Sequence, residues 1–218
     1  MTPATAWVLR AGAPFLLVLL LVAGFAVAAS APTVDNRIRG KADAPVTLIE
    51  YSDFTCGYCL KFFKETWPKI QAQYVDTGKV RFLYKDYPRA DQGPGLTAAI
   101  AARCAGDQGA YWPMHDRLFS ADGRLDVDTY SQHAQTIGLD QSRFRQCLRD
   151  APYVKAIFQD RDEANSWGFH GTPGFVLMRT SQQPTTKDPA IAIPGAFPFE
   201  AFEEEIEKLL APPGGKKK

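Results

Sequence analysis

The sequence predicts a mixed α/β domain with an inserted all-helical subdomain. A strand–helix–strand (βαβ) half precedes the insertion, and a strand–strand–helix (ββα) half follows it. Two observations support this prediction. Runs of β-branched and aromatic residues, typical of strands, occur both before and after the helical insertion. Between them, residues from about 90 to 168 carry apolar side chains at helical spacing almost throughout. With 218 residues, the chain is long enough for one such domain.

The first half begins with a predicted buried strand at residues 46–51, which is rich in β-branched and aromatic side chains. After Cys56, apolar residues recur at helical spacing as far as Tyr74, and we expect Pro68 to bend or restart this helix. Residues 79–85 alternate in polarity like a second strand. The order predicts a right-handed βαβ unit.

The second half contains predicted strands at residues 174–178 and 191–193, and an amphipathic helix at 199–210. We therefore place the globular domain at residues 40–211. Residues 212–218 are short, basic and rich in Gly and Lys, so we expect a disordered tail.

The N-terminal 28 residues are predicted to be a secretory signal peptide. Arg10 precedes an apolar run at residues 15–22, and residues 26–28 have the small-x-small form that signal peptidase accepts. The competing interpretation is an uncleaved N-terminal membrane anchor, because residues 11–29 are near the length that spans a bilayer. Both interpretations place the domain in the periplasm or another extracytoplasmic compartment.

The charge balance argues against one class of partner. The 25 basic and 24 acidic residues give a formal net charge of +1, which offers no basic surface for nucleic acid.

The motif Cys56-Gly57-Tyr58-Cys59 carries the predicted chemistry. A C-x-x-C pair also occurs in zinc sites, but Cys104 and Cys147 have no neighbouring ligands and the three histidines are scattered, so we expect no metal site. Cys56 falls where a strand ends and a helix begins, and the helix N-terminus stabilises a thiolate. Cys56 is therefore the predicted nucleophile and Cys59 the resolving thiol, a redox pair that needs no cofactor.

A second signal is Gly171-Thr172-Pro173, immediately before the strand at 174–178. With a cis peptide bond, Pro173 would leave the backbone of Thr172 free to pair with an extended peptide. A trans proline in a loop is the alternative that this short motif leaves open. Tyr58 offers an aromatic face to such peptides, or else covers the site.

Taken together, these features resemble the DsbA-type thioredoxin-like oxidoreductases of bacterial envelopes, over residues 40 to 210. The segments that carry the resemblance are IEYSDFTCGYC at 49–59, KDYP at 85–88, YWPMHD at 111–116, GTP at 171–173 and IPGAF at 193–197. The resemblance implies a thioredoxin fold with an inserted helical domain, a nucleophilic first cysteine and a cis-proline loop that faces it.

The resemblance also implies roles for two charged residues. Glu50 would lie buried under the cysteine pair as a proton acceptor, and such a carboxylate needs a partner or a raised pKa. Lys85, on the neighbouring predicted strand, is the expected partner of Glu50. The alternative for Glu50 is an outward-facing strand residue.

Cys104 and Cys147 each lie on the apolar face of a predicted helix of the insertion. In an exported protein we expect a structural disulfide between them. Two free core thiols, or a bridge that regulates the active site, remain as alternatives.

The direction of the chemistry is predicted from the residues between the cysteines. The family's strongest oxidants have Pro and His there, whereas this chain has Gly57 and Tyr58. We therefore expect a pKa of Cys56 between about 3.5 and about 7, and a milder oxidant. The predicted function is a dithiol oxidase that introduces disulfides into reduced or unfolded exported proteins and is re-oxidised by a membrane redox partner.

Two alternatives to the oxidase remain. One is an envelope disulfide reductase with a dedicated client, and the other is a non-catalytic chaperone or metal carrier that uses the same groove. We expect a monomer. The family's isomerases dimerise through an additional N-terminal domain, and the roughly 15 residues between the predicted signal peptide and the first predicted strand leave no room for one.

Overall fold

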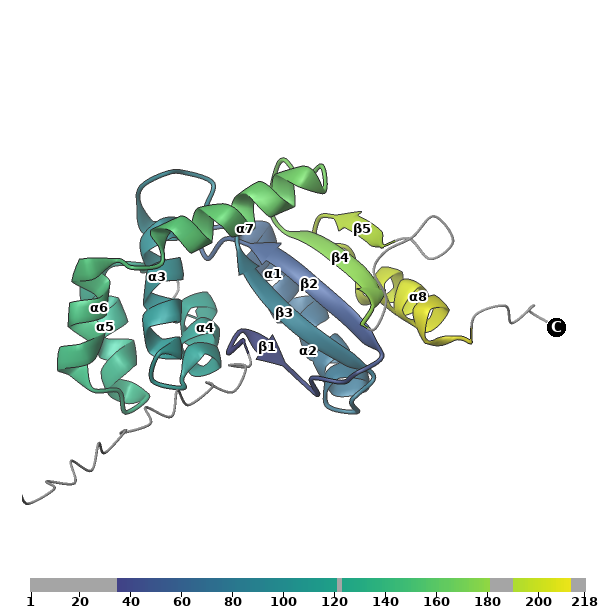
Figure 1. Ribbon diagram of the computed structural model, residues 1–218, viewed down its shortest axis with the longest axis horizontal. Coiled ribbons are helices and arrows are strands. Elements are labelled where there is room, and N and C mark those ends of the chain that lie inside the picture. The colour runs from purple at the N-terminus through teal and green to yellow at the C-terminus, as the bar shows by residue number, and fades with distance from the viewer. Residues whose placement is uncertain (1–34, 121–122, 181–189, 213–218) are drawn as a thin grey trace, which may run out of the picture. The chain divides into compact units, whose positions relative to one another are not determined.

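The computed structural model describes residues 35–120, 123–180 and 190–212, which contain a five-stranded mixed sheet flanked by helices (Figure 1). The strands lie in the order β1-β3-β2-β4-β5; β2 and β3 are parallel and the other neighbours are antiparallel. Their bounds are β1 (Ile38–Arg39), β2 (Val46–Ser52), β3 (Val80–Asp86), β4 (Gly174–Arg179) and β5 (Ile191–Pro194). The predicted α/β fold with a helical insertion is confirmed.

Two predicted segments lie largely or wholly outside the described residues. These are the signal peptide or anchor at 1–28 and the basic tail at 212–218, of which the structure describes Pro212. Within the part of the chain that is described, no helix has both the length and the apolar character needed to cross a membrane.

Strand β1 was not predicted from the sequence. It pairs antiparallel with β3, with Ile38 opposite Leu83 and Arg39 opposite Phe82. A two-residue strand carries no periodic signal of its own, because its conformation is set by the strand beside it.

One helical stretch follows β2 and contains wide turns on both sides of Pro68. Its successive segments are α1 (Gly57–Lys61), the π-helical turn η1 (Phe62–Thr66), α2 (Trp67–Ile70) and the π-helical turn η2 (Gln71–Val75). Proline cannot donate to the preceding turn, and a wider turn accommodates the missing hydrogen bond. The predicted restart at Pro68 therefore takes the form of a new α-helical segment, whose second residue is the proline.

Alternation along the strands separates two buried layers. Leu48, Phe82 and Phe175 belong to the larger core with side chains of α2 and α8 (Phe199–Leu210). Ile49, Tyr51 and Val176 point the other way, into a smaller core with Ala164 of α7 (Val154–Ser166). Figure 1 accordingly shows α7 in front of the sheet and α1 and α2 behind it.

The insertion consists of helices between β3 and β4. They are α3 (Pro94–Gly106), α4 (Tyr111–Ser120), α5 (Val127–Thr136), α6 (Gln141–Asp150) and α7. In the structure Cys104 of α3 and Cys147 of α6 form a disulfide, with an S–S distance of 1.97 Å. The two cysteines are 43 positions apart in the sequence, and their bridge ties α3 to α6.

Removing this bridge is expected to destabilise the protein without removing the C-x-x-C pair. A closed loop of this length restricts the unfolded chain by roughly 4 kcal/mol, so Cys104→Ala/Cys147→Ala should lower the free energy of unfolding by about 3–4 kcal/mol. Denaturant titration of the variant and the parent protein, both under non-reducing conditions, measures the difference. An unchanged midpoint would show that the bridge contributes nothing to stability.

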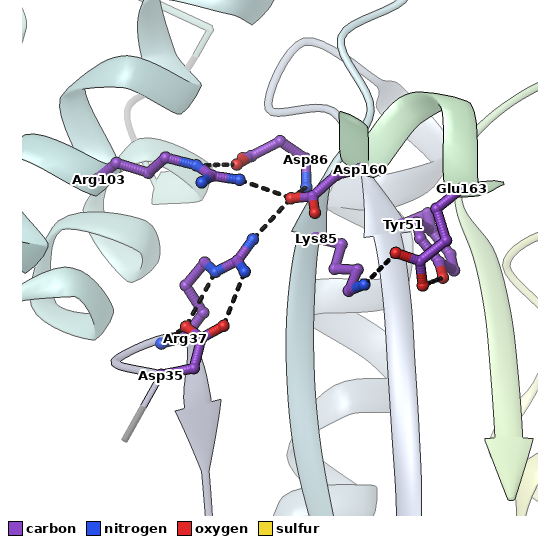
Figure 2. A network of polar contacts seen from close by, with 8 residues as sticks. All are labelled: Asp35, Arg37, Tyr51, Lys85, Asp86, Arg103, Asp160 and Glu163. Carbon is purple, nitrogen blue, oxygen red and sulfur yellow. Dashed lines mark hydrogen bonds and ion pairs between the residues drawn. The ribbon is translucent and has the colours of Figure 1, made fainter. Parts of the chain in front are cut away.

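A network of charges, buried at Asp86, Arg103 and Asp160, connects the insertion to the sheet (Figure 2). Asp160 of α7 accepts from Arg37 at 2.6 Å and from Arg103 of α3 at 2.5 Å. Arg103 also donates to Asp86, the last residue of β3, at 2.7 Å, and Arg37 pairs with Asp35 at 2.7 Å. Each charge faces an opposite charge, which is the condition under which ionic groups tolerate burial.

Candidate active site

Cys56 lies at the start of α1, four residues after the end of β2. Its extended backbone caps the helix: its N–H donates to the carbonyl of Asp53 at 2.9 Å, and its own carbonyl accepts from Leu60 at 3.0 Å. Cys56 is 5% exposed and Cys59, one turn further along, is fully buried. Both are free thiols in the structure. The strand-to-helix junction predicted from the sequence therefore holds the pair.

The two sulfur atoms have very different acidities. A hydrogen bond from the thiol of Cys59 lowers the pKa of Cys56 to about 5, against the opposing effect of burial, and the backbone N–H groups of Tyr58 and Cys59 contribute as well. Burial, together with the charges of Cys56 and Glu50, raises the pKa of Cys59 well above its ordinary value. At neutral pH the pair therefore holds one thiolate, on Cys56, and one thiol, on Cys59.

The loop before β4 faces the sulfur of Cys56. The Thr172–Pro173 peptide bond is cis, and Sγ of Cys56, in its thiol form, donates to the carbonyl of Thr172 at 3.3 Å. Two segments 116 residues apart in the sequence thus meet at the reactive sulfur. Backbone groups at such a position can pair with an extended peptide, so peptide binding by Thr172 and Pro173 remains our prediction.

Glu50 is buried on the same face of the sheet as the cysteine pair. It is 3% exposed, and the strand register places it between Tyr84 of β3 and Phe175 of β4. Burial, and then the charge of Cys56, raise the pKa of Glu50 to about 8, and none of the described cations pairs with it. Glu50 is thus mostly protonated at neutral pH and lies close enough for its charge to act on Cys59.

Lys85 does not pair with Glu50, so the prediction that it would is wrong. In the parallel register Glu50 lies opposite Tyr84, whereas Lys85 lies opposite Tyr51. Because adjacent strand residues point to opposite faces, Lys85 lies on the side of the sheet that α7 covers. There its ammonium group binds the carboxylate of Glu163, which also accepts from the hydroxyl of Tyr51 at 2.6 Å (Figure 2).

Asp53 and Arg89 support the loop that carries Cys56, and sequence reasoning did not single them out. The buried carboxylate of Asp53 accepts from the N–H and hydroxyl of Thr55, at 2.8 and 2.7 Å, and from the N–H of Arg89 at 3.0 Å. The guanidinium of Arg89 extends over the same carboxylate at 3.4 Å. The Asp-x-Thr spacing ahead of the cysteine was the available signal, since Asp favours such local turns.

Asp53→Ala is expected to destabilise this loop strongly. It leaves the partly buried N–H groups of Thr55 and Arg89 without their acceptor and opens a cavity at a buried position, and we expect the free energy of unfolding to fall by about 1–3 kcal/mol. Asp53→Asn retains one acceptor oxygen, so its free energy of unfolding should fall by less. Denaturant titration of both variants tests this order. An alanine variant as stable as the parent would show that the contacts are dispensable.

Tyr58 of α1 projects into solvent. Its side chain is 69% exposed, and Phe197, in the loop after β5, is also exposed, at 46%. Both stand out because large apolar side chains are seldom this exposed. The structure therefore leaves Tyr58 available to a peptide, and its role in binding one remains a prediction.

Comparison with known proteins identifies the family. A family model described as thioredoxin (Thioredoxin_4) matches residues 32–188. The chain belongs to this family. Among solved structures, α-DsbA1 of Wolbachia pipientis is 26% identical with a TM-score of 0.68, over 79% of this chain and 89% of that one. A thioredoxin-like oxidoreductase of Silicibacter pomeroyi is also 26% identical, with a TM-score of 0.66, over 80% and 92%. The domain is a DsbA-like thiol–disulfide oxidoreductase.

Curated relatives include proteins much longer than this DsbA-like chain. The Na(+)/H(+) antiporter NhaA 1 of Salinispora arenicola is 37% identical over 143 residues, which are 65% of this chain and 21% of the antiporter. A protein-disulfide oxidoreductase of Rickettsia bellii is 23% identical over 149 residues, which are 57% of that protein. The chain thus spans about a fifth of the antiporter's length and somewhat over half of the rickettsial protein.

Proposed function

We propose that this chain is a dithiol oxidase that donates the Cys56–Cys59 disulfide to reduced exported proteins. The observation that carries the proposal is the depressed pKa of Cys56, about 5, beside a buried Cys59 whose pKa is raised. A stabilised thiolate favours the reduced form of the enzyme and so makes its disulfide a stronger oxidant. The value lies between the roughly 3.5 of the strong oxidant DsbA and the roughly 7 of thioredoxin.

The reaction consists of two exchanges. A substrate thiolate attacks Sγ of Cys56 in the oxidised enzyme, forming a mixed disulfide and releasing Cys59 as a thiolate. A second substrate thiolate then attacks the substrate sulfur, which completes the substrate disulfide and releases Cys56 as a thiolate. Two electrons pass from the substrate to the enzyme. Of the two protons lost by the substrate thiols, one ends on Cys59 and the other goes to solvent.

Glu50 supplies the proton that Cys59 requires. A thiolate at a fully buried position is costly, and Glu50 is protonated at neutral pH in the same desolvated layer. Transfer to Cys59 leaves a carboxylate that takes up the solvent-derived proton, and re-oxidation runs the path in reverse. Glu50 therefore acts as the proton relay of the site, without Lys85.

The substrate and location follow from the sequence and the loop before β4. The apolar N-terminal segment supports export to the periplasm or another extracytoplasmic compartment, with or without cleavage. The backbone of Thr172, held beside the reactive sulfur, suits an extended, unfolded chain. A membrane redox partner would return the dithiol to the disulfide.

Equilibration with glutathione buffers tests the direction. We expect a reduction potential between about −120 mV, the value of DsbA, and about −270 mV, the value of thioredoxin. The reduced and oxidised fractions can be counted by mass after thiol alkylation. A potential near the thioredoxin value would overturn the oxidase proposal and indicate a reductase.

A further inference from the structure

A cavity of about 420 Å³ lies beside Cys56, between the first turn of α1 and the insertion. Its lining comes from two stretches, the segment that contains the C-x-x-C motif and the helices that follow β3. The apolar side chains that line it are Phe54, Leu60, Pro94, Leu118, Phe119 and Leu125. It therefore lies on the side of α1 that faces α4, and draws nothing from β5 or α8.

The floor of this pocket is closely packed. Phe54, Leu118 and Phe119 are buried, and the rings of Phe54 and Phe119 are 4.8 Å apart between centroids. Phe119 also stacks on Phe63 of η1 at 5.1 Å. Apolar surface that is already held in place binds a partner without a large ordering cost.

The pocket opens directly onto the reactive sulfur. Cys56 and Gly57 are part of its lining, and a Cβ atom at Gly57 would meet no other atom within 4 Å, so there is open space beside the backbone at this position. Adjacent residues of an extended chain lie about 3.8 Å apart. A residue next to the cysteine that is bonded to Cys56 can therefore reach the pocket, while its backbone passes Thr172.

The chemistry of the lining selects the occupant. Among the described residues that line the pocket, none has a charged side chain once Cys56 is in the disulfide that meets a reduced substrate, and Thr55 contributes the polar side chain. A neighbouring cavity of about 400 Å³ contains Arg89, but that guanidinium is already paired with Asp53. A charged side chain would lose its hydration in the pocket without gaining a partner, whereas an apolar one would lose only water.

We propose that this pocket binds one large apolar side chain, such as Leu, Ile, Met or Phe, carried by the substrate residue next to the reacting cysteine. The inference rests on the proposed function and adds a sequence preference to it. Unfolded exported chains supply such residues, because apolar residues that later enter their cores are still accessible. Full burial of a leucine side chain corresponds to a preference of about tenfold or more.

Two dithiol peptides that differ only in having Leu or Ser beside the first cysteine test this preference. For the parent protein we expect kcat/KM for oxidation of the Leu peptide to exceed that of the Ser peptide by about tenfold. Leu125→Asp places a charge in the pocket and should reduce the ratio to within about twofold. Val127→Asp makes the same charge change outside the lining, at an exposed position, and should leave the ratio intact.

The outcomes separate the pocket from the direction of the chemistry. Equal rates for the two peptides with the parent protein, or a full preference in a folded Leu125→Asp variant, would overturn the pocket proposal. If that variant fails to fold, Leu125→Ser replaces it under the same criterion. The disulfide forms of both peptides are assayed as well. Efficient reduction with the Leu preference, but no oxidation, would overturn the oxidase and support the pocket.

Discussion

Cys56→Ser is expected to lower the rate of thiol–disulfide exchange by roughly a thousandfold or more. An alcohol cannot form a disulfide, and the residue replaced is the one whose sulfur is ionised at neutral pH and faces Thr172. The substitution is nearly isosteric, so the variant should fold. Insulin reduction and oxidation of a dithiol peptide both report the loss.

Cys59→Ser is the matched variant. It keeps the attacking thiolate but removes the sulfur that resolves the mixed disulfide, so complexes with substrate should accumulate and be visible by mass under non-reducing conditions. If Cys59→Ser abolished complex formation while Cys56→Ser preserved it, the roles assigned to the two sulfurs would be reversed. A binder that uses the groove without chemistry would retain its function in both variants.

Glu50→Gln is expected to stabilise the reduced protein increasingly as the pH rises from about 4.5 to 8. The pKa of Glu50 is about 8 in the fold, against its ordinary value of 4.5. Between these values the unfolded chain has lost the proton and the native chain retains it, so rising pH destabilises the parent. The difference approaches about 1.4 kcal/mol per pH unit, or roughly 3–5 kcal/mol by pH 8.

Cys56 contributes in the opposite sense, because its pKa is depressed from 9.0 to about 5 and the native thiolate stabilises the fold as the pH rises. This contribution is common to parent and variant, so it cancels in their difference. Denaturant titrations at pH 4.5, 6 and 8 with reduced samples measure that difference. Glu65→Gln, at an exposed position, controls for the change in charge. A difference between Glu50→Gln and the parent that did not vary with pH would contradict the shifted ionisation of Glu50.

The elements with their own periodic signal could be predicted from the sequence. The strand at 46–51 and the helix at 199–210 agree with β2 and α8 to within a residue. The position of Cys56 at a helix start followed from these elements, because a motif between a strand and a helix must occupy the junction. The order of the elements around the insertion was equally accessible.

What the sequence did not reveal depends on register and on distant partners. The predicted pairing of Glu50 with Lys85 was wrong because a shift of one position along a strand moves a side chain to the other face of the sheet. The sequence of two adjacent strands does not show which of their residues lie opposite each other, and so does not show which share a face. Asp53 and Arg89 are 36 positions apart, and their contact follows from how β3 leads into the insertion. Phe54 and Leu125 line one pocket for the same reason.

The buried charges of Asp86, Arg103 and Asp160 make it harder for the insertion to separate from the sheet. If the insertion detached from the sheet, Asp86 would remain in a desolvated position without Arg103, and isolating one member of such a pair costs about 3–5 kcal/mol. Local detachment is thereby disfavoured relative to unfolding of the whole domain. In hydrogen-exchange terms, the amides of α3, α7 and β3 should behave as a single cooperative unit. The pocket beside Cys56, which lies between α1 and the insertion, therefore keeps its shape from one substrate to the next.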